Sequence, residues 1–156
     1  MGSNTYYKAA AENRKARFDY TILEVYKAGI ILSGHEVKSL RLGQANIRDS
    51  FGRVERGEIW LFNMHITPYL SADKNQLDPL RRRKLLLHKR ELLKLIGKVA
   101  EKGLTLVPLK VYFEGNWAKV DIALAKAKRK YEKREKLRRQ SAEREIESAL
   151  KRKNNE

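Results

Sequence analysis

The feature of the sequence that constrains the fold most strongly is the alternation of apolar and polar side chains over residues 105–124. Between residues 105 and 124, apolar side chains recur at every second position on either side of Gly115-Asn116. Successive residues of a strand point to opposite faces, and a glycine-containing pair permits a tight turn. The pattern predicts a hairpin with one apolar face, whose apolar positions are Thr105, Val107, Leu109, Val111, Phe113, Val120, Ile122 and Leu124.

Turn and helix signals divide the preceding sequence into short elements. Ser33 is followed three residues later by Glu36, the pattern of a capping box, and Gly43 stands where the helix is expected to end. A second helix is predicted over 89–102, where apolar residues recur at helical spacing before Gly103. Residues 18–26 and 30–32, with a bend at Ala28-Gly29, are predicted to be two strands or one bent strand. Further strands are predicted over 47–54 and 58–66, with a hairpin turn at Arg56-Gly57 and a surface loop over 71–78.

Short antiparallel strands, two helices and no βαβ rhythm predict a mainly β fold with short helices. We expect a small closed antiparallel barrel of the oligonucleotide-binding-like kind, because closure leaves no exposed sheet edge. Residues 1–12 lack periodicity and are predicted to be a flexible leader. The barrel domain is then expected over 13–125, and a basic C-terminal tail over 126–156.

The charge of the chain indicates nucleic acid as its partner. Lysine and arginine number 35 against 19 acidic residues, giving a formal net charge of +16 that attracts polyanions. An anionic membrane surface is the rival partner, but no segment approaches the roughly 18 apolar residues that span a bilayer. The sequence has no cysteine, which fits a reducing compartment, so the expected location is cytoplasmic.

Catalytic motifs are missing from the sequence. His35, His65 and His88 are scattered without metal-ligand spacing, and no glycine-rich phosphate loop or nucleophile elbow occurs. We therefore expect no enzymatic activity, no metal and no cofactor. A carboxylate pair that meets only in the folded chain is invisible in a sequence, so a nuclease remains an alternative.

Basic clusters interleaved with aromatic residues are typical of nucleic-acid binding. The basic positions are the clusters 13–17 and 81–84 together with Lys38, Arg41, Lys110 and Lys119. The aromatic candidates for base stacking are Tyr20, Tyr26, Trp60, Tyr69, Tyr112 and Trp117, and core packing is favoured for most of them. Trp60 stands beside Leu61 and Phe62 and is predicted to pack in the core. Tyr112 shares the face of Lys110, so core packing and base stacking both stay open for it.

The segment after residue 125 is predicted to become helical on binding a partner. Its large aliphatic residues are only Leu137, Ile146 and Leu150, so it cannot bury enough surface to join the core. Acid-first i,i+4 pairs favour a helix, at Glu132 and Lys136, Glu135 and Arg139, and Glu147 and Lys151. Each pair contributes only about 0.2–0.5 kcal/mol, so we expect the free tail to fray.

Four motifs occur in order: Asn13-Arg14-Lys15-Ala16-Arg17, Gly34-His35-Glu36-Val37-Lys38-Ser39-Leu40-Arg41, Arg83-Lys84-Leu85-Leu86-Leu87 and Gly103-Leu104-Thr105-Leu106-Val107-Pro108-Leu109. Together they resemble the small protein B family, the tmRNA-binding partners in bacterial ribosome rescue. The resemblance implies an oligonucleotide-binding-like barrel that holds the elbow of the tRNA-like part of tmRNA. It also implies a tail that turns helical in the empty messenger channel of a stalled ribosome.

The implied partners are tmRNA, the decoding centre and messenger channel of the small ribosomal subunit, and the elongation factor Tu complex, with the protein a monomer. By motif, RNA contact is expected from Asn13, Arg14, Lys15, Arg17, Lys38, Arg41, Lys84, Leu86 and Lys119. Ribosome contact by the tail is expected from Lys126, Lys128, Arg129, Lys130, Tyr131, Lys133, Arg134, Lys136, Arg138 and Arg139. Two residues depart from the family pattern: Ala127 replaces a glycine, which puts the hinge before the tail in doubt, and Phe18 replaces a histidine.

The main hypothesis is therefore a non-catalytic adaptor for trans-translation. A ribosomal or cold-shock-like protein is the alternative among binding modules, and stable binding to ribosomes without tmRNA would indicate it. Cleavage of RNA by the purified protein would indicate the nuclease.

Overall fold

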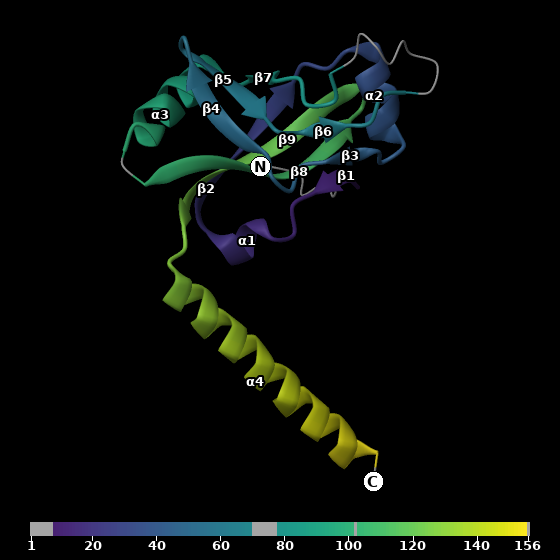
Figure 1. Ribbon diagram of the computed structural model, residues 1–156, viewed down its shortest axis with the longest axis vertical. Helices are drawn as coiled ribbons and strands as arrows, with labels where there is room; N and C mark the ends of the chain where they lie inside the picture. Colours follow the sequence, from purple (N-terminus) through teal and green to yellow (C-terminus); the bar gives the residue numbers. More distant parts are fainter. Residues whose placement is uncertain (1–7, 70–77, 102, 156) are drawn as a thin grey trace.

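The computed structural model describes residues 8–69, 78–101 and 103–155 of the chain. A β-rich body carries short helices, and one long helix projects from it (Figure 1). The strands are β1 (Ala9–Glu12), β2 (Tyr20–Ile30), β3 (Ala45–Asn46), β4 (Phe51–Glu55), β5 (Glu58–Phe62), β6 (His65–Ile66), β7 (Arg83–Leu86), β8 (Leu104–Glu114) and β9 (Trp117–Ala127). The helices are α1 (Ala16–Asp19), α2 (Gly34–Arg41), α3 (Lys89–Val99) and α4 (Lys130–Asn154).

Hydrogen bonds join the main sheet into a ring of antiparallel strands. Its order is β1-β8-β4-β5-β7-β2-β9, and β9 pairs with β8 as well as with β2. Strands β3 and β6 form a separate two-stranded sheet. The mainly β fold with short helices that the sequence predicts is confirmed.

Apolar side chains from the inner faces of the strands fill this ring. Leu61, Leu106, Val111 and Ile122 are fully buried there. The register of β8 against β9 shifts between Pro108 and Lys110, so Leu106 faces inward before the shift and Val111 after it. The predicted apolar face is therefore wrong at Val107 and Leu109, which pack in a second cluster.

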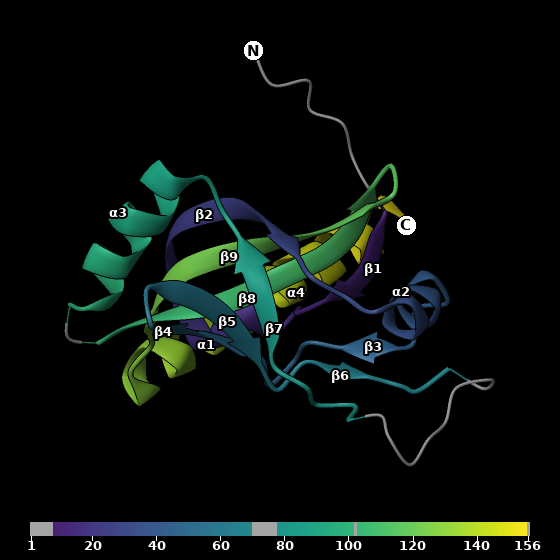
Figure 2. The same ribbon diagram turned by 90° about the horizontal axis from the view of Figure 1, so that it is seen from above.

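Helices α2 and α3 lie at opposite ends of the ring (Figures 1 and 2), and each inserts a fully buried leucine, Leu40 from α2 and Leu95 from α3. On the outer face, Ala16 of α1 forms the second buried cluster with Val107 and Ala125. The rest of that face remains for binding.

Gly52 allows β4 to approach β8 where the ring closes. It pairs with Leu106, and a Cβ atom at Gly52 would lie 2.8 Å from the Leu106 Cβ. We expect Gly52→Ala to lower the free energy of unfolding by about 1–3 kcal/mol, because the added methyl must displace a packed core side chain. Chemical denaturation measures the change.

Gly97 in α3 provides the matched control, because a Cβ atom there meets nothing within 4 Å. Gly97→Ala should raise stability by up to about 1 kcal/mol through helix propensity alone. An unchanged unfolding midpoint for Gly52→Ala would mean that β4 can shift away from β8 freely.

The turn and cap signals are where the sequence predicts them. Arg56 and Gly57 both have positive φ, 50° and 74°, as a tight hairpin turn requires. Gly43, which follows α2, has φ 72°, and the Ser33 backbone N–H donates to Glu36 Oε1 at 2.9 Å. The predicted cap and stop of this helix are confirmed.

The predicted leader is wrong at its last four residues. These form β1, which pairs with β8 from Ala9 opposite Tyr112 to Glu12 opposite Lys110. Backbone hydrogen bonds to β8 suffice for this alanine-rich strand, so hydrophobic periodicity gives no signal of it. The remainder of the leader up to residue 7 lies outside the described residues.

Three strand boundaries also differ from the prediction. Strand β2 is one continuous strand to Ile30 and not two, because its pairing with β9 extends to Gly29 opposite Lys119. The predicted strand 58–66 ends at Phe62, since Asn63 has φ 59° and turns the chain before β6. The strand predicted over 47–54 begins only at Phe51. The loop predicted over 71–78 lies outside the described residues except for Asp78.

The tail begins later than predicted. Lys126 and Ala127 belong to β9, where they pair with Thr21 and Tyr20, so the body ends at Ala127. The extended backbone of Ala127 accepts alanine without strain. Helix α4 spans 25 residues, and the apolar side chains Leu137, Ile146 and Leu150 are all exposed on it. Fraying of this helix in the free protein stays a prediction.

Candidate nucleic-acid interface

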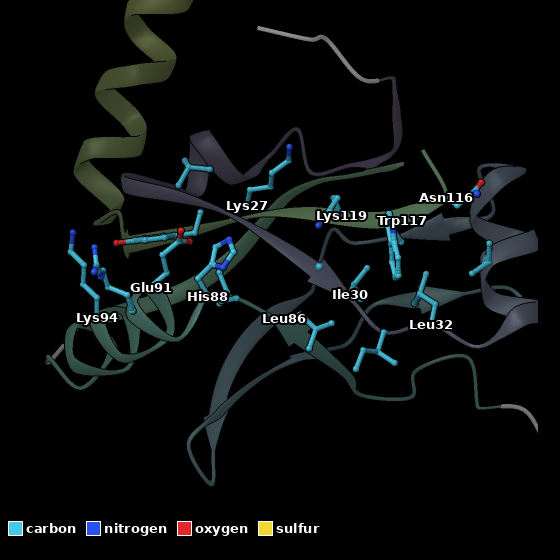
Figure 3. A pocket seen from close by; sticks show the side chains of 18 residues that line it. Lys27, Ile30, Leu32, Leu86, His88, Glu91, Lys94, Asn116, Trp117 and Lys119 are labelled. Carbon is cyan, nitrogen blue, oxygen red and sulfur yellow. The ribbon is translucent and has the colours of Figure 1, made fainter. Parts of the chain in front are cut away.

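A groove of about 940 Å³ lies on the outer face of the body between β2, the start of α3 and the turn that joins β8 to β9 (Figure 3). Its apolar surface includes Val25, Ile31 and Leu86, each close to half exposed. Trp117 is 75 % exposed and lies beside Lys119. The groove thus offers an aromatic ring and aliphatic side chains to a ligand.

Cationic side chains border the same groove. These are Lys27, Arg90, Lys94 and Lys119, against the carboxylate of Glu91. Cations track a phosphate backbone, while exposed aromatic rings stack on unpaired bases. The combination is suited to a nucleic acid with exposed bases.

One wall of the groove is held in place by an ion pair. Tyr26 donates its hydroxyl proton to Glu24, and Lys98 of α3 binds the same carboxylate. The hydrogen bond to Glu24 raises the pKa of Tyr26 to about 12, so the phenol stays neutral at physiological pH. Hydrogen bonds from Lys98 and then Tyr26 lower the pKa of Glu24. This contact fixes α3 against β2.

Two of the predicted RNA contacts, Leu86 and Lys119, meet in this groove. Gly29 of β2 lies between them, since it pairs with Leu86 on β7 and with Lys119 on β9. Lys84 lies two residues before Leu86 on the same outer face, with its Nζ 3.5 Å from Glu58 Oε1. Strand pairing therefore brings Leu86 and Lys119, about 33 positions apart in the sequence, into one surface.

Lys38 and Arg41 lie at the other end of the ring, on α2. Both are exposed, and each lies against an aromatic ring: Lys38 Nζ is 5.4 Å from the centre of Tyr69, and Arg41 Cζ is 4.2 Å from that of Phe113. Cation–π contacts hold the charged groups in place while leaving them open to solvent. Val37 of the same helix lines the groove, so Lys38 and Arg41 lie on a helix that borders the groove, although neither of them lines it.

The segment 13–17 lies along β8 and forms a third basic region. Asn13 is buried, donates from Nδ2 to the Pro108 carbonyl at 3.3 Å and anchors the segment. RNA contact by Asn13 itself stays a prediction. Arg14, Lys15 and Arg17 are exposed and remain the predicted contacts of this region.

The predicted tail residues divide into two groups. Lys128, Lys133 and Lys136 contact α1, with Lys133 Nζ 3.2 Å from Asp19 Oδ1. Those exposed to solvent are Lys126, Arg129, Arg134, Arg138 and Arg139. The side chains of Lys130 and Tyr131 lie outside the part of the chain that is described.

The basic cluster 81–84 is not a uniform phosphate-binding surface. Arg83 is fully buried and bonded to Glu36, whereas Arg81 and Arg82, which precede it, are exposed. Alternation along the strand explains the difference, because Arg83 and Leu85 face the interior while Lys84 and Leu86 face outward. The phosphate-binding role considered for this cluster therefore cannot include Arg83.

The structure decides between core packing and exposure for two aromatic residues. Trp60 faces outward between the buried Ile59 and Leu61, and the Arg82 guanidinium lies 4.5 Å from its ring centre, so the predicted core position is wrong. Tyr112 is buried and donates to Asp121 Oδ1 at 3.0 Å.

Lys27, Arg90 and Lys94 were not among the predicted contacts, although all border the groove. Trp117 borders it too; it was a candidate for base stacking but was not assigned as an RNA contact. For Trp117 a signal exists, because it precedes Lys119 by two residues and must share its face.

Within the described residues, no group of three or more histidine, cysteine, aspartate or glutamate side chains is arranged to hold a metal ion. None of the described helices is long and apolar enough to cross a membrane.

Comparison with known proteins finds one family along nearly the whole chain. The sequence model of the SmpB protein family matches residues 10–152. An SsrA-binding protein from Carboxydothermus hydrogenoformans is 60 % identical over 143 residues, which cover 92 % of this chain and 96 % of that protein. One from Geobacillus thermodenitrificans is 54 % identical and covers 92 % of each chain.

A solved structure is similar as well. It is described as "tmRNA-SmpB: a journey to the center of the bacterial ribosome", with a TM-score of 0.66 and 54 % sequence identity. The similarity covers 82 % of this chain and 94 % of the other.

Proposed function

Because the chain belongs to the SmpB family, we propose that it is a tmRNA-binding adaptor of trans-translation. The body binds the elbow of the tRNA-like domain of tmRNA, and the tail enters the empty messenger channel of the small subunit of a stalled ribosome. The groove supports this proposal most directly, because it joins the predicted contacts Leu86 and Lys119 to an exposed tryptophan.

Each group in the groove has a distinct part in binding. Lys119 and its cationic neighbours bind phosphates, and Leu86 packs against a sugar or base. Trp117 stacks on an unpaired base, an interaction that typically contributes about 1–3 kcal/mol. Lys38 and Arg41, at the far end of the ring, bind phosphates of another part of the RNA.

The finer features of the family follow as parts of this proposal. The ring of strands is an oligonucleotide-binding-like barrel, a class to which its closure through β8 and β9 corresponds. The protein acts in the cytoplasm as a monomer, without catalysing a reaction, and joins the complex of tmRNA with elongation factor Tu.

A filter-binding titration tests the choice of RNA and the groove together. The protein should prefer tmRNA to an unrelated structured RNA at moderate salt. Lys119→Glu should weaken tmRNA binding by about tenfold, or ~1.4 kcal/mol, because a phosphate contact becomes a repulsion. The slope of log affinity against log salt should fall by about one unit.

Arg53→Glu is the matched control, since Arg53 is exposed on β4 outside the groove and the charge change is the same. It should bind tmRNA like the parent protein. Equal affinity for both RNAs would reject the adaptor, whereas equal effects of the two substitutions would reject only the groove.

A further inference from the structure

The end of the β8–β9 hairpin, residues 113–118, extends past the strands that pair with it, and we call it the hairpin tip (Figure 2). Strand β2 pairs with β9 as far as Lys119, and β1 pairs with β8 as far as Tyr112. Among the described strands, neither pairing continues into the hairpin tip, where Glu114 lies opposite Trp117. Side-chain contacts must therefore help to set the position of the tip.

Side chains from two neighbouring elements contact the hairpin tip. Lys27 Nζ of β2 lies 2.6 Å from Glu114 Oε2, with the two side chains 48 % and 37 % exposed. Arg41 Cζ of α2 lies 4.2 Å from the ring centre of Phe113. An ion pair and a cation–π contact thus join the tip to β2 and to α2.

Trp117 depends on the hairpin tip for its position. It is 75 % exposed, so packing against the body does little to hold its ring. A side chain that is already in place loses less conformational entropy when a ligand stacks on it. A fixed tip therefore strengthens the stacking of an unpaired base, the interaction proposed for this residue.

Glu114 is unfavourable for RNA binding by itself. Its carboxylate repels phosphates and neutralises Lys27, one of the cations that border the groove. Phosphate binding explains the lysine alone, whereas an ion pair that fixes the hairpin tip explains both residues.

We propose that Lys27 and Glu114 are positioning residues, which hold the hairpin tip so that Trp117 faces the base on which it stacks. The inference rests on the proposed function for the RNA, and it gives Lys27 a role different from that of Lys119. A phosphate that captured Lys27 would release the tip, so the ion pair and a phosphate contact exclude each other.

Time-resolved fluorescence anisotropy tests the ion pair in the free protein. The chain has two tryptophans, so Trp60→Phe leaves Trp117 as the sole tryptophan. In this background, Glu114→Gln should increase the nanosecond part of the anisotropy decay, because the tip is released from β2. Exchanging the two charges, with Lys27→Glu and Glu114→Lys together, should restore the parent decay. An unchanged decay in Glu114→Gln, or no recovery on exchange, would overturn the proposal.

Filter binding to tmRNA separates positioning from direct phosphate contact. Lys27→Glu should weaken binding about fivefold, the effect of losing an ion pair of this exposure. Glu114→Lys should weaken binding as well, although it adds positive charge, and the exchanged variant should return to within about twofold of the parent. Tighter or unchanged binding by Glu114→Lys, or an exchanged variant as weak as Lys27→Glu, would show a phosphate contact and overturn the proposal.

Glu55→Gln is the matched control, since it breaks the ion pair with Arg82, which is similarly exposed and lies outside the groove. It should change neither the decay of Trp117 nor tmRNA affinity. Effects equal to those of Glu114→Gln would mean that any lost surface carboxylate suffices, and would overturn the assignment. The anisotropy measurement uses no RNA, so a parent protein that fails to prefer tmRNA would reject the proposed function and leave the result on the tip intact.

Discussion

Glu36→Ala should lower the free energy of unfolding by about 3–5 kcal/mol, because it leaves the guanidinium of Arg83 buried without a counter-charge. The Arg83 side chain is fully buried, and that of Glu36 is 3 % exposed. Arg83 Nε donates to Glu36 Oε2 at 2.6 Å, and its other nitrogens donate to the carbonyls of Met64 and Pro79. This pair joins α2, β7 and the chain after β5.

The neighbouring Arg82 is the matched control for Arg83. It is half exposed and pairs with Glu55 at 2.5 Å on the surface. Arg83→Ala should therefore be as damaging as Glu36→Ala, whereas Arg82→Ala should cost about 1 kcal/mol or less. Urea denaturation measures all three. Similar losses for Arg82→Ala and Arg83→Ala would show that burial does not set the strength of the pair.

The double variant Glu36→Leu/Arg83→Met separates charge from packing. Replacing both members of a buried ion pair by apolar groups is often nearly neutral, so this variant should be more stable than either single variant. A double variant as unstable as the sum of the single variants would indicate that the hydrogen bonds of Arg83 to the backbone dominate.

The pH dependence of stability follows from the same pair. Burial alone would raise the pKa of Glu36, but hydrogen bonds from Arg81 and the Ser33 backbone and the charge of Arg83 lower it to about 2, from an ordinary value of 4.5. A carboxylate with a depressed pKa stabilises the fold above the unfolded value, and that stability is lost as pH falls from 4.5 towards 2. Glu36→Gln should remove this part of the acid dependence, which acid titration followed by circular dichroism measures.

Local signals in the sequence predict the turns and caps well. Gly57 and Gly43 occupy positions that need positive φ, and Ser33 with Glu36 marks the start of α2. Such features depend on a few neighbouring residues. The hairpin of β8 and β9 is equally local, since its partners flank one turn.

Contacts between side chains far apart in the sequence could not be predicted. Arg83 belongs to a run of four basic residues, and nothing in that run indicates a carboxylate 47 positions earlier that enters the core beside it. The sequence identified Glu36 only as a capping residue of α2, although its carboxylate also forms the buried ion pair with Arg83. Trp60 was assigned to the core because its neighbours are apolar, yet alternation places Ile59 and Leu61 inside and turns Trp60 outward.

The candidate site was predictable only through the family resemblance. Composition indicates RNA, but it does not show that Leu86 and Lys119 flank Gly29 in one groove. The residues that complete the groove come from α3 and from the turn after β8, whose positions depend on closure of the ring. Trp117 is the exception, because its two-residue spacing from Lys119 was readable.

Ending the chain after Lys128 should leave tmRNA affinity within about threefold of the parent protein and reduce peptide tagging on stalled ribosomes by about a hundredfold, a difference of ~2 kcal/mol between the two activities. Helix α4 leaves its large apolar side chains exposed, so its removal opens no cavity in the body. The groove on the body is complete without it. The tail, in contrast, is the part proposed to enter the messenger channel.

The position of this truncation matters because β9 extends to Ala127. Ending the chain after Leu124 would remove residues that pair with Tyr20, Thr21 and Ile22, and would confuse loss of the tail with damage to the ring. Filter binding and tagging of a stalled nascent chain measure the two activities, and a thermal melt shows that the truncated body folds.

A matched full-length variant with a proline replacing Ser141 keeps the tail charges but interrupts its helix. If peptide tagging needs only the charge of the tail, the Ser141→Pro variant tags normally. If the tail must be helical to fill the channel, the variant loses tagging activity but still binds tmRNA. Parallel loss of RNA binding and tagging on truncation would contradict the division of roles between body and tail.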